Sequence, residues 1–506
     1  MNGEFYLRIS ELFDLKKTQL ELDFIDIDVN NELPLFLDGQ VFSLRDDVWS
    51  RWCSDLIEDY FRNIFSAIKI GDKTRMRMLY SYLAEPNETC LGRSKNEPRG
   101  AFQGLESIEK IFLSFYKIQE KNPENINVFQ SISDMKFYIE GVGNDTISDI
   151  VTNIIREPLL EYTKNQCELH GIPLNELPTK PIWNGQKSKW ECIDKFPQLV
   201  INERKILFVP KNIVFREEGY LYKPQSFVQH DMLNFLVEKE LNILNSPLIQ
   251  RRSPKKGQTI GDPYVTKKSL RELYKPDRKE FILDFCSKYP EIMNKFKNKK
   301  HFSSLCIDDL FLLQNKEITD KDFNDFIDAL ISTLKDIPLG RKHANEYHKF
   351  ITGLMTFLFY PSLTNPKEET PIDDKSKRID ITFINSAESG FFYELKRKVI
   401  CNYIYVECKN YSSEISNPEL DQLSGRYNHS MGKVGLLLCR SVKKRADLLK
   451  RISGMYRRTG NISIVLSDKM LVEMLNEMKL GDLYTHLYNY EKILFNELRE
   501  IELENF

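Results

Sequence analysis

Three residues in the last third of the chain combine side chains that could hold a metal ion and activate water. Asp380 stands in the apolar segment RIDITFIN, and Glu407 and Lys409 are separated by one residue in NYIYVECKN. In a β-strand, residues two apart point to the same face, about 6.6 Å from each other. The carboxylate and the ammonium group would then share one surface. This set suits phosphodiester hydrolysis, because carboxylates can hold Mg²⁺ and a lysine can polarise the attacking water and contact the phosphate.

The residues before Glu407 favour a buried strand for this pair. The run 404–406 is Ile-Tyr-Val, which is typical of a central strand covered on both faces. Charges that end such a strand need partners, because an unpaired buried charge is costly. A metal ion and a phosphate would be such partners. The alternative is that Glu407 and Lys409 form a surface pair on an edge strand.

A second segment carries the same Glu-x-Lys spacing. Glu394 and Lys396 lie in FFYELKRK, only 14 residues after Asp380. This segment is more typical of a short helix or turn, and on a helix residues two apart do not share a face. We therefore expect Glu394 and Lys396 to belong to a solvated charged segment.

The elements around these residues alternate between helix and strand patterns. A helix is expected over 339–359, followed by an extended, proline-interrupted segment over 360–373. The remaining elements are, in order, strands over 378–385 and 402–410, a helix over 418–428, a strand over 433–440, a helix over 442–458 and a strand over 461–467. Such alternation predicts an α/β layer built on a mixed sheet.

With Asp380 followed by Glu407-Cys408-Lys409 in the order helix, strand, strand, strand, helix, strand, residues 335–470 resemble the PD-(D/E)XK nuclease superfamily, which has the restriction-endonuclease-like fold. The resemblance implies that Asp380, Glu407 and the backbone carbonyl of Cys408 hold the metal ion. It also implies that Lys409 assists the attack. Ile379 replaces the proline of the motif name.

Two further residues match positions that the superfamily often uses. Glu346, on the helix before the first strand, corresponds to a glutamate that often joins the metal site. Gln422, on the helix after the motif, corresponds to a polar residue near the active site. The alternatives are a solvent-facing charge for Glu346 and an exposed helix residue for Gln422. Tyr427 lies five residues after Gln422, so the Gln-x-x-x-Tyr spacing of one branch of the superfamily is not met.

Two basic stretches could contact a nucleic-acid backbone. Residues 440–458 hold eight Lys or Arg and one acid, Asp447. Our candidates for phosphate contacts there are Lys443, Lys444, Arg445, Lys450 and Arg451. The alternative is a solvated helix face. Residues 250–280 hold ten Lys or Arg and four acids, and we expect a linker there, with a phosphate-contacting loop as the alternative.

The fold class expected for the whole chain is α/β. A restriction-endonuclease-like mixed sheet flanked by helices forms its C-terminal part, and a larger mixed α+β region precedes it. The expected divisions are an α+β domain over 1–170, a mixed middle region over 171–330, the nuclease domain over 331–480 and an amphipathic C-terminal helix over 481–506.

Local patterns in the first two regions predict four elements. The segment LDFIDIDV (22–29) alternates apolar and acidic residues, which indicates a strand. A long amphipathic helix is expected over 48–68, and a strand hairpin over 199–210. Thr146 and Asp149 have the spacing of a capping box in front of a single helix.

Bulk composition excludes several classes of protein. The 506 residues carry a net charge of −2, so a nucleic-acid surface would have to be a local patch. The sequence contains no GxxxxGK[ST] or HExxH motif, and its nine cysteines form no CxxC pair. No apolar run reaches the length of a membrane span, and the first residues lack a signal-peptide core. We therefore expect a cytoplasmic protein.

These observations predict a Mg²⁺-dependent DNA endonuclease in which Mn²⁺ can substitute. The resemblance suggests a restriction or antiphage-defence effector that acts as a homo-oligomer, with possible partner proteins of a defence system. Two alternatives stay open: a toxic effector nuclease that cleaves RNA, and a non-catalytic scaffold that binds nucleic acid. The first 330 residues carry no motif that assigns them a role, although their acidic balance favours regulation or assembly over reading of bases.

Overall fold

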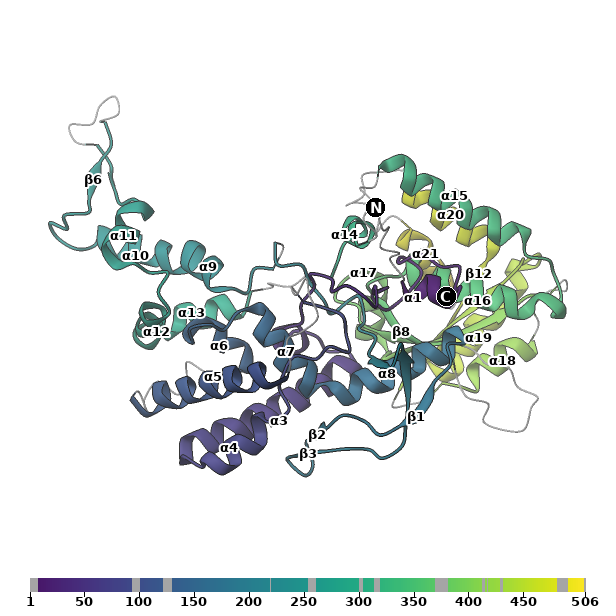
Figure 1. Cartoon of the computed structure of the whole chain (residues 1–506). Coiled ribbons are helices and arrows are strands. Elements are labelled where there is room, and N and C mark those ends of the chain that lie inside the picture. Colours follow the sequence, from purple (N-terminus) through teal and green to yellow (C-terminus); the bar gives the residue numbers. More distant parts are fainter. Residues whose placement is uncertain are drawn as a thin grey trace, which may run out of the picture.

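The computed structural model divides into an N-terminal helical region, a middle region of short strands and helices, and a C-terminal sheet with helices packed on it (Figure 1). The fold is mixed α/β, as expected, and the C-terminal sheet has five strands in mixed orientation. The residues that the structure describes are 8–92, 101–121, 130–218, 220–253, 261–299, 304–313, 319–368, 381–411, 415, 417–427, 431–479 and 490–504.

The longest N-terminal helix, α3 (Val48–Ile70), confirms the prediction for residues 48–68. The side chain of Asp47 caps it by accepting a hydrogen bond from the Ser50 amide, and Gly71 ends it at φ +77°, the left-handed conformation that glycine favours. The other N-terminal helices are α1 (Ile9–Leu12), α2 (Gly39–Ser43), α4 (Lys73–Tyr80), α5 (Ala101–Lys121), the 3₁₀ turn η2 (Ile132–Asp134) and α6 (Met135–Tyr138).

The segment 22–29 is not a strand, which corrects the expectation from its alternating pattern. It forms only isolated bridges, and all eight residues are buried, the aspartates included. Hydrogen bonds satisfy these carboxylates: Asp26 accepts from the amide and hydroxyl of Ser10 at 2.9 and 2.6 Å. Asp23 accepts from the Tyr162 hydroxyl at 2.8 Å. The alternation therefore records buried carboxylates with specific partners rather than a solvent-facing edge.

The helix expected after residue 143 is two helices, and the predicted capping box is wrong. Helix α7 (Asn144–Ile154) begins after Gly143, so Thr146 already lies inside its first turn. A break at Ile155 separates it from α8 (Arg156–His170). Helix α8 is the element that faces the C-terminal sheet.

The predicted hairpin at 199–210 is confirmed in the middle region. Strands β4 (Phe196–Ile201) and β5 (Arg204–Ile206) pair antiparallel. Asn202 and Glu203 connect them with φ values of +48° and +64°, as a two-residue hairpin turn requires. Strand β1 (Asn175–Leu177) completes this sheet, and β2 (Ile182–Asn184) pairs with β3 (Lys189–Glu191).

Much of the stretch 250–280 has regular structure, so describing it as a linker is only partly right. It contains β6 (Gln250–Arg251), β7 (Pro263–Tyr264) and α11 (Lys267–Tyr274), while 254–260 lie outside the described residues. The other helical elements here are α9 (Pro224–Phe227), the π-helical turn η3 (Val228–Met232), α10 (Leu233–Leu241), α12 (Lys279–Lys288), α13 (Pro290–Lys297), α14 (Ile307–Leu312) and α15 (Asp320–Asp336).

The C-terminal sheet has the order β12-β11-β10-β9-β8. Strands β8, β9 and β10 are antiparallel to their neighbours, whereas β10, β11 and β12 run parallel. The strands are β8 (Leu363–Glu368), β9 (Ile381–Asn385), β10 (Tyr403–Lys409), β11 (Val434–Cys439) and β12 (Ile462–Ser467). The helical elements are η4 (Arg341–His343), α16 (Ala344–Leu358), α17 (Gly390–Lys398), α18 (Asn417–Ser424), α19 (Arg445–Thr459), α20 (Asp468–Lys479) and α21 (Glu491–Leu503). The predicted strands and helices of this region are thereby confirmed wherever the structure describes them.

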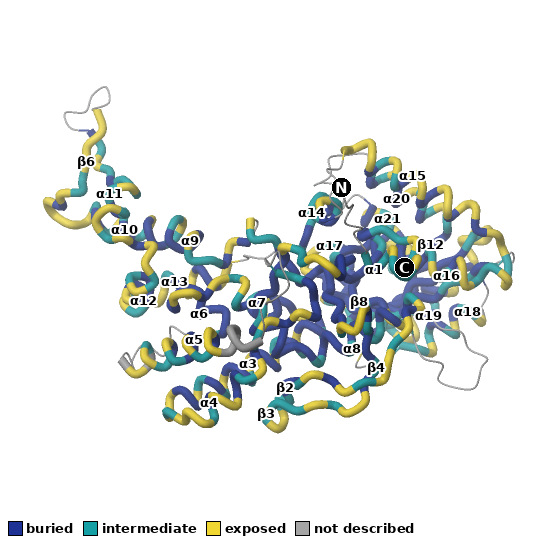
Figure 2. Tube along the Cα trace, in the orientation of Figure 1, coloured by how far each residue is buried: buried dark blue, intermediate teal, exposed yellow. Residues whose placement is uncertain are grey.

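The N-terminal region packs directly on the edge of this sheet, where α8 lies beside β8 (Figure 1). The Gln166 side-chain amide donates to the Pro366 carbonyl at 2.9 Å, and the Asn365 amide donates to Asp23 at 3.0 Å. Buried residues run without interruption from this contact into the sheet (Figure 2). Residues of the first 170 therefore form part of the same core as the sheet.

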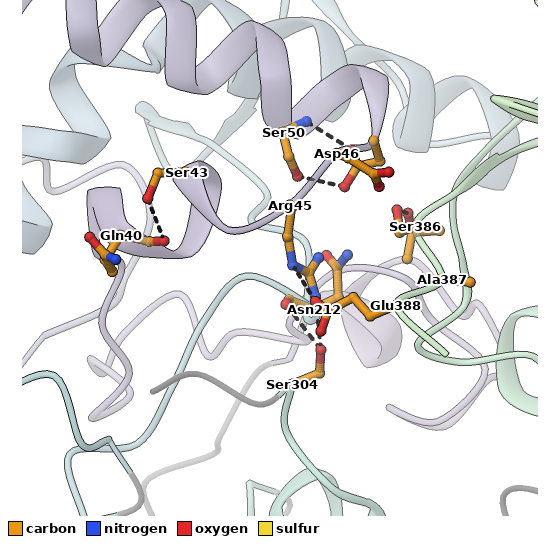
Figure 3. A network of polar contacts seen from close by, with 12 residues as sticks. Gln40, Ser43, Arg45, Asp46, Ser50, Asn212, Ser304, Ser386, Ala387 and Glu388 are labelled. Atoms are coloured by element: carbon orange, nitrogen blue, oxygen red, sulfur yellow. Dashed lines mark hydrogen bonds and ion pairs between the residues drawn. The ribbon is translucent and has the colours of Figure 1, made fainter. Parts of the chain in front are cut away.

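A second junction joins the loop before α3 to the turn between β9 and α17. Arg45 donates to the Ser304 hydroxyl at 3.0 Å and lies 3.6 Å from the Glu388 carboxylate, as Figure 3 shows. Asp46 pairs with Lys396 of α17 at 2.8 Å. A cavity of about 220 Å³ lies at this junction and is lined in part by Arg45 and Glu388.

Candidate functional site

Glu407 lies near the carboxyl end of β10, a strand with neighbours on both sides. In β10 the residue before it, Val406, pairs with Ile381 of β9, and Glu407 itself pairs with Leu437 of β11. Its side chain is 1% exposed. The edge-strand alternative for Glu407 and Lys409 is therefore wrong: the carboxylate is buried in the middle of the sheet, as its apolar predecessors predicted.

The two oxygens of Glu407 have different surroundings. Oε1 forms an ion pair with Lys409 Nζ. Oε2 lies 3.6 Å from Arg426 Nη2, and within the described part of the chain no donor is hydrogen-bonded to it. Buried carboxylate oxygens in folded proteins almost always accept hydrogen bonds, so an exception calls for an explanation.

Helix α18 supplies the next contacts of this cluster. Lys409 Nζ donates to the Gln422 side-chain oxygen at 3.1 Å, so the structure brings Gln422 to Glu407 and Lys409 as predicted. Arg426 follows just after the same helix. Sequence reasoning missed Arg426, since a single arginine beyond the end of a helix resembles any solvated cation.

A glycine and a tyrosine hold α18 in place over the sheet. A Cβ on Gly435 of β11 would lie 2.7 Å from Leu423 Cδ1 and from the Tyr427 hydroxyl, so the close approach requires glycine. The Tyr427 hydroxyl is 2.6 Å from the Ser463 hydroxyl and donates to the Ile462 carbonyl at 3.1 Å. Tyr427 therefore anchors the segment that carries Gln422 and Arg426.

Glu346 stands in the first turn of α16, close to the end of β10. The Asn410 side chain, just after β10, donates to the Pro338 and Gly340 carbonyls at 2.9 and 3.1 Å and ties this turn to the strand. Yet the Glu346 side chain is 59% exposed, and its carboxylate contacts His343 Nδ1 at 3.1 Å. The structure places Glu346 near the strand end without bringing it into contact with Glu407.

Asp380 lies outside the described residues, which resume at Ile381, the first residue of β9. Cys408 follows Glu407 in β10, with its side chain on the opposite face of the sheet. Among the described residues, no group of three or more His, Cys, Asp or Glu side chains is placed to hold a metal ion. A metal site at Glu407 would therefore need Asp380 or backbone and water ligands.

Arg440, from the expected basic run, is a structural residue rather than a free cation. It donates to Asp468 at 2.6 Å, to the Ile337 carbonyl at 2.9 Å and to the Asn410 side-chain oxygen at 2.9 Å. It also lies over the Tyr347 ring, 5.0 Å from the centroid. Burial raises the pKa of Asp468, and Arg440 opposes that shift. This network fixes the edge of the sheet where β10 and β11 end.

The predicted phosphate-contacting residues have different environments. Helix α19 begins at Arg445, so Lys443 and Lys444 precede it, and both are exposed. Arg445 is bound to Glu497 and Glu500 of α21 at 2.7 and 2.6 Å, and these hydrogen bonds raise its pKa. The last two candidates, Lys450 and Arg451, are exposed on α19.

The second Glu-x-Lys segment forms α17, as expected for a short helix. Glu394 contacts Arg397 at 3.4 Å. Lys396 is 13% exposed, because it is paired with Asp46 and does not extend into solvent as we expected. The nearby Glu394 and Lys396 therefore belong to the junction with the N-terminal region and not to the Glu407 cluster.

Comparison with known proteins identifies one family, for part of the chain. Residues 14–221 match a domain of unknown function, DUF8370. No curated protein and no solved structure matches the chain. The matched range continues past residue 170, where a domain boundary was expected. None of the described helices is long and apolar enough to span a bilayer.

Proposed function

We propose that the chain is a Mg²⁺-dependent nuclease that hydrolyses phosphodiester bonds in DNA, with Glu407 and Lys409 at its active site. The observation that carries the proposal is the buried carboxylate of Glu407, whose Oε2 accepts no hydrogen bond within the described residues. Two cationic side chains, Lys409 and Arg426, lie beside it. A carboxylate for a metal next to cations for a phosphate is the combination that phosphodiester cleavage needs.

The order and direction of the strands support this proposal. Strands β8, β9 and β10 follow α16 and are antiparallel, and β11 and β12 extend the sheet parallel to β10 after α18 and α19. This arrangement resembles the restriction-endonuclease-like sheet that the sequence pattern suggested. Because fold does not imply function, the side chains at Glu407 carry the argument rather than the sheet.

The donor atoms fit a hard divalent cation. Glu407 Oε2 is an available carboxylate oxygen, and Mg²⁺ prefers one or two carboxylates while it keeps several waters. Asp380 is covalently bonded to Ile381, so its Cα lies about 3.8 Å from that of Ile381, whose strand partner precedes Glu407. We propose Asp380, Glu407 and the Cys408 carbonyl as ligands. When bound, the ion would stabilise charge that develops on the phosphate.

The side chains around Glu407 have separate roles in this proposal. Lys409 donates a hydrogen bond to the attacking water or to a phosphate oxygen, and Gln422 holds the lysine in position. Arg426, 18% exposed, offers a second cation to the phosphate. Glu346 stays a prediction, since its described contact is with His343.

The proposal is tested with purified full-length protein, plasmid DNA and single-stranded RNA in Mg²⁺ or in EDTA. We expect Mg²⁺-dependent cleavage of DNA, reduced by about 100-fold or more in Lys409→Ala. The matched control is Lys396→Ala, the lysine of the second Glu-x-Lys segment, which should retain most activity. Cleavage of RNA alone would assign the same chemistry to the other substrate. Full activity of Lys409→Ala, or no cleavage of either substrate, would refute the assignment.

A further inference from the structure

A second cavity, of about 250 Å³, lies where the N-terminal region covers the sheet. Helices α3 and α8 form one wall, and residues of β8, β9 and β10 form the other. Its volume is below the roughly 300–1,000 Å³ that is common for drug-sized ligands. The cavity therefore suits a small molecule or one part of a larger ligand.

The cavity shares a face of the sheet with Glu407. Its lining includes Tyr403 of β10 and Thr382 of β9. Thr382 pairs directly with Tyr405, so these two side chains point to the same face. Tyr403, Tyr405 and Glu407 alternate along β10 and share that face. Thr382 thus lies one strand over and about 6.6 Å along the strand direction from the row of Glu407.

Aromatic side chains dominate the lining. Trp49 and Trp52 come from α3, Tyr162 from α8 and Tyr403 from β10. Flat aromatic surfaces of this kind bind planar rings by stacking, and stacking on aromatic side chains is the usual way in which proteins hold an unstacked base.

Two buried polar groups in the lining lack hydrogen-bond partners among the described residues: the indole N–H of Trp49 and the side-chain oxygen of Gln166. Trp49 is 8% exposed and Gln166 is fully buried. The Gln166 amide nitrogen is already bonded to Pro366, which fixes the orientation of the side chain. Buried indole N–H groups usually find a partner, so an unmatched donor and an unmatched acceptor in one cavity indicate a ligand that offers both.

We propose that this cavity binds a nucleobase, stacked on the aromatic side chains and hydrogen-bonded to Trp49 and Gln166. Every base presents donor and acceptor atoms on its edge beside a flat ring. The placement next to Glu407 favours a base of the nucleic-acid substrate, drawn out of its stack while the adjoining phosphate lies at the active site. In that form the inference rests on the proposed function. The same chemistry would also accept a free nucleotide as an effector.

The inference gives the N-terminal region a role in substrate binding. Three of the residues that would contact the base, Trp49, Trp52 and Gln166, lie within the range that matches DUF8370. From the acidic balance of this region we expected regulation or assembly. A neutral aromatic cavity leaves no trace in charge counts, which explains why the sequence did not indicate base recognition.

The test measures binding without cleavage, in EDTA, with the full-length chain. The probes are the 5′-mononucleotides of the four DNA bases and a single-stranded oligonucleotide, and the readout is tryptophan fluorescence, since two of the four tryptophans line the cavity. We expect saturable quenching that weakens about tenfold or more in Trp52→Ala, in keeping with the loss of a stacking surface. Trp49→Phe, which removes an N–H with no described partner, and Gln166→Leu should weaken binding as well.

The control variant is Gln225→Leu, the same change at an exposed glutamine on α9, which should bind like the wild type. If the oligonucleotide displaces the mononucleotide, the occupant is a base of the substrate. If mononucleotide and oligonucleotide bind together, the occupant is a free nucleotide. Unchanged affinity for both probes in Trp49→Phe, Trp52→Ala and Gln166→Leu would overturn the proposal. Nucleotide binding by a protein that cleaves nothing would leave the cavity assigned and refute the nuclease.

Discussion

The N-terminal region and the C-terminal sheet both bury carboxylates, but only one of them leaves a carboxylate oxygen without a hydrogen bond among the residues compared here. Asp23 and Asp26 accept hydrogen bonds from Tyr162 and Ser10, and these bonds oppose the rise in pKa that burial causes in both. Glu407 is equally buried, yet within the described residues its Oε2 has only a cation at 3.6 Å. The difference separates carboxylates that stabilise a fold from one that is available to a ligand.

The largest effect on stability is expected in the N-terminal region, at the ion pair of Asp38 and Lys136. Both side chains are at most 1% exposed, and burial lowers the pKa of Lys136. Lys136→Met would leave the Asp38 carboxylate buried without its cation, which should lower the free energy of unfolding by about 3–5 kcal/mol. Glu407→Gln should lower it by only about 1 kcal/mol. Urea denaturation of both variants measures this, and a larger loss for Glu407→Gln would contradict the comparison.

A smaller effect is expected at Asp149, where acidic side chains gather. Burial, followed by the carboxylates of Asp145, Glu85 and Glu32, raises the pKa of Asp149 to about 8. The folded protein then keeps a proton that the unfolded chain releases near pH 4. The stabilisation is therefore complete below about pH 4 and is lost as the pH rises through about 8.

Asp149→Asn mimics the protonated carboxyl and should flatten this dependence. We expect it to raise the free energy of unfolding by about 1 kcal/mol near pH 8, with solvent screening limiting the gain. Near pH 4 it should change little. Denaturation curves of the wild type and the variant at both pH values are the measurement, and equal slopes with pH would assign the stability profile to other groups.

The smallest effect concerns the exposed cations after β11. Lys409 pairs with Cys439 in the parallel ladder, so the chain leaves β11 at the edge where Lys409 lies, and Lys443 and Lys444 follow. Changing both lysines to alanine should flatten the salt dependence of DNA binding by up to about one log–log unit for each phosphate interaction that the change removes.

Arg445→Ala is the matched control for the lysines, because Glu497 and Glu500 already neutralise that charge. It should leave the salt dependence nearly unchanged. Binding isotherms at several salt concentrations measure both variants. A larger change for Arg445→Ala than for the two lysines would assign the phosphate contacts to the helix itself.

The sequence predicted the sheet better than it predicted the N-terminal region. Each strand of the sheet is a short apolar run bounded by polar residues, and the spacing of Glu407 and Lys409 in such a run was enough to place them. The segment 22–29 gave the wrong structure, because the partners of its aspartates, Ser10 and Tyr162 among them, are unrelated to it in any local pattern.

The candidate site was predictable only where one segment carries its residues. Gln422 was found through the resemblance to a nuclease superfamily, whereas Arg426 belongs to no motif. The cavity beside Glu407 joins Trp49 to Gln166 and Tyr403, three residues from distant parts of the chain. No periodicity or spacing connects them, so only the folded chain brings them together.

The most direct test of the central claim is whether Glu407 binds a divalent cation. Mn²⁺ binding to the full-length protein can be followed by electron paramagnetic resonance of the free ion, in the wild type, in Glu407→Gln and in Asp26→Asn as a buried carboxylate with hydrogen-bond partners. We predict binding by the wild type and by Asp26→Asn, and a loss of at least about tenfold in affinity for Glu407→Gln. Equal Mn²⁺ affinity in all three proteins would contradict the assignment of Glu407 as a metal ligand.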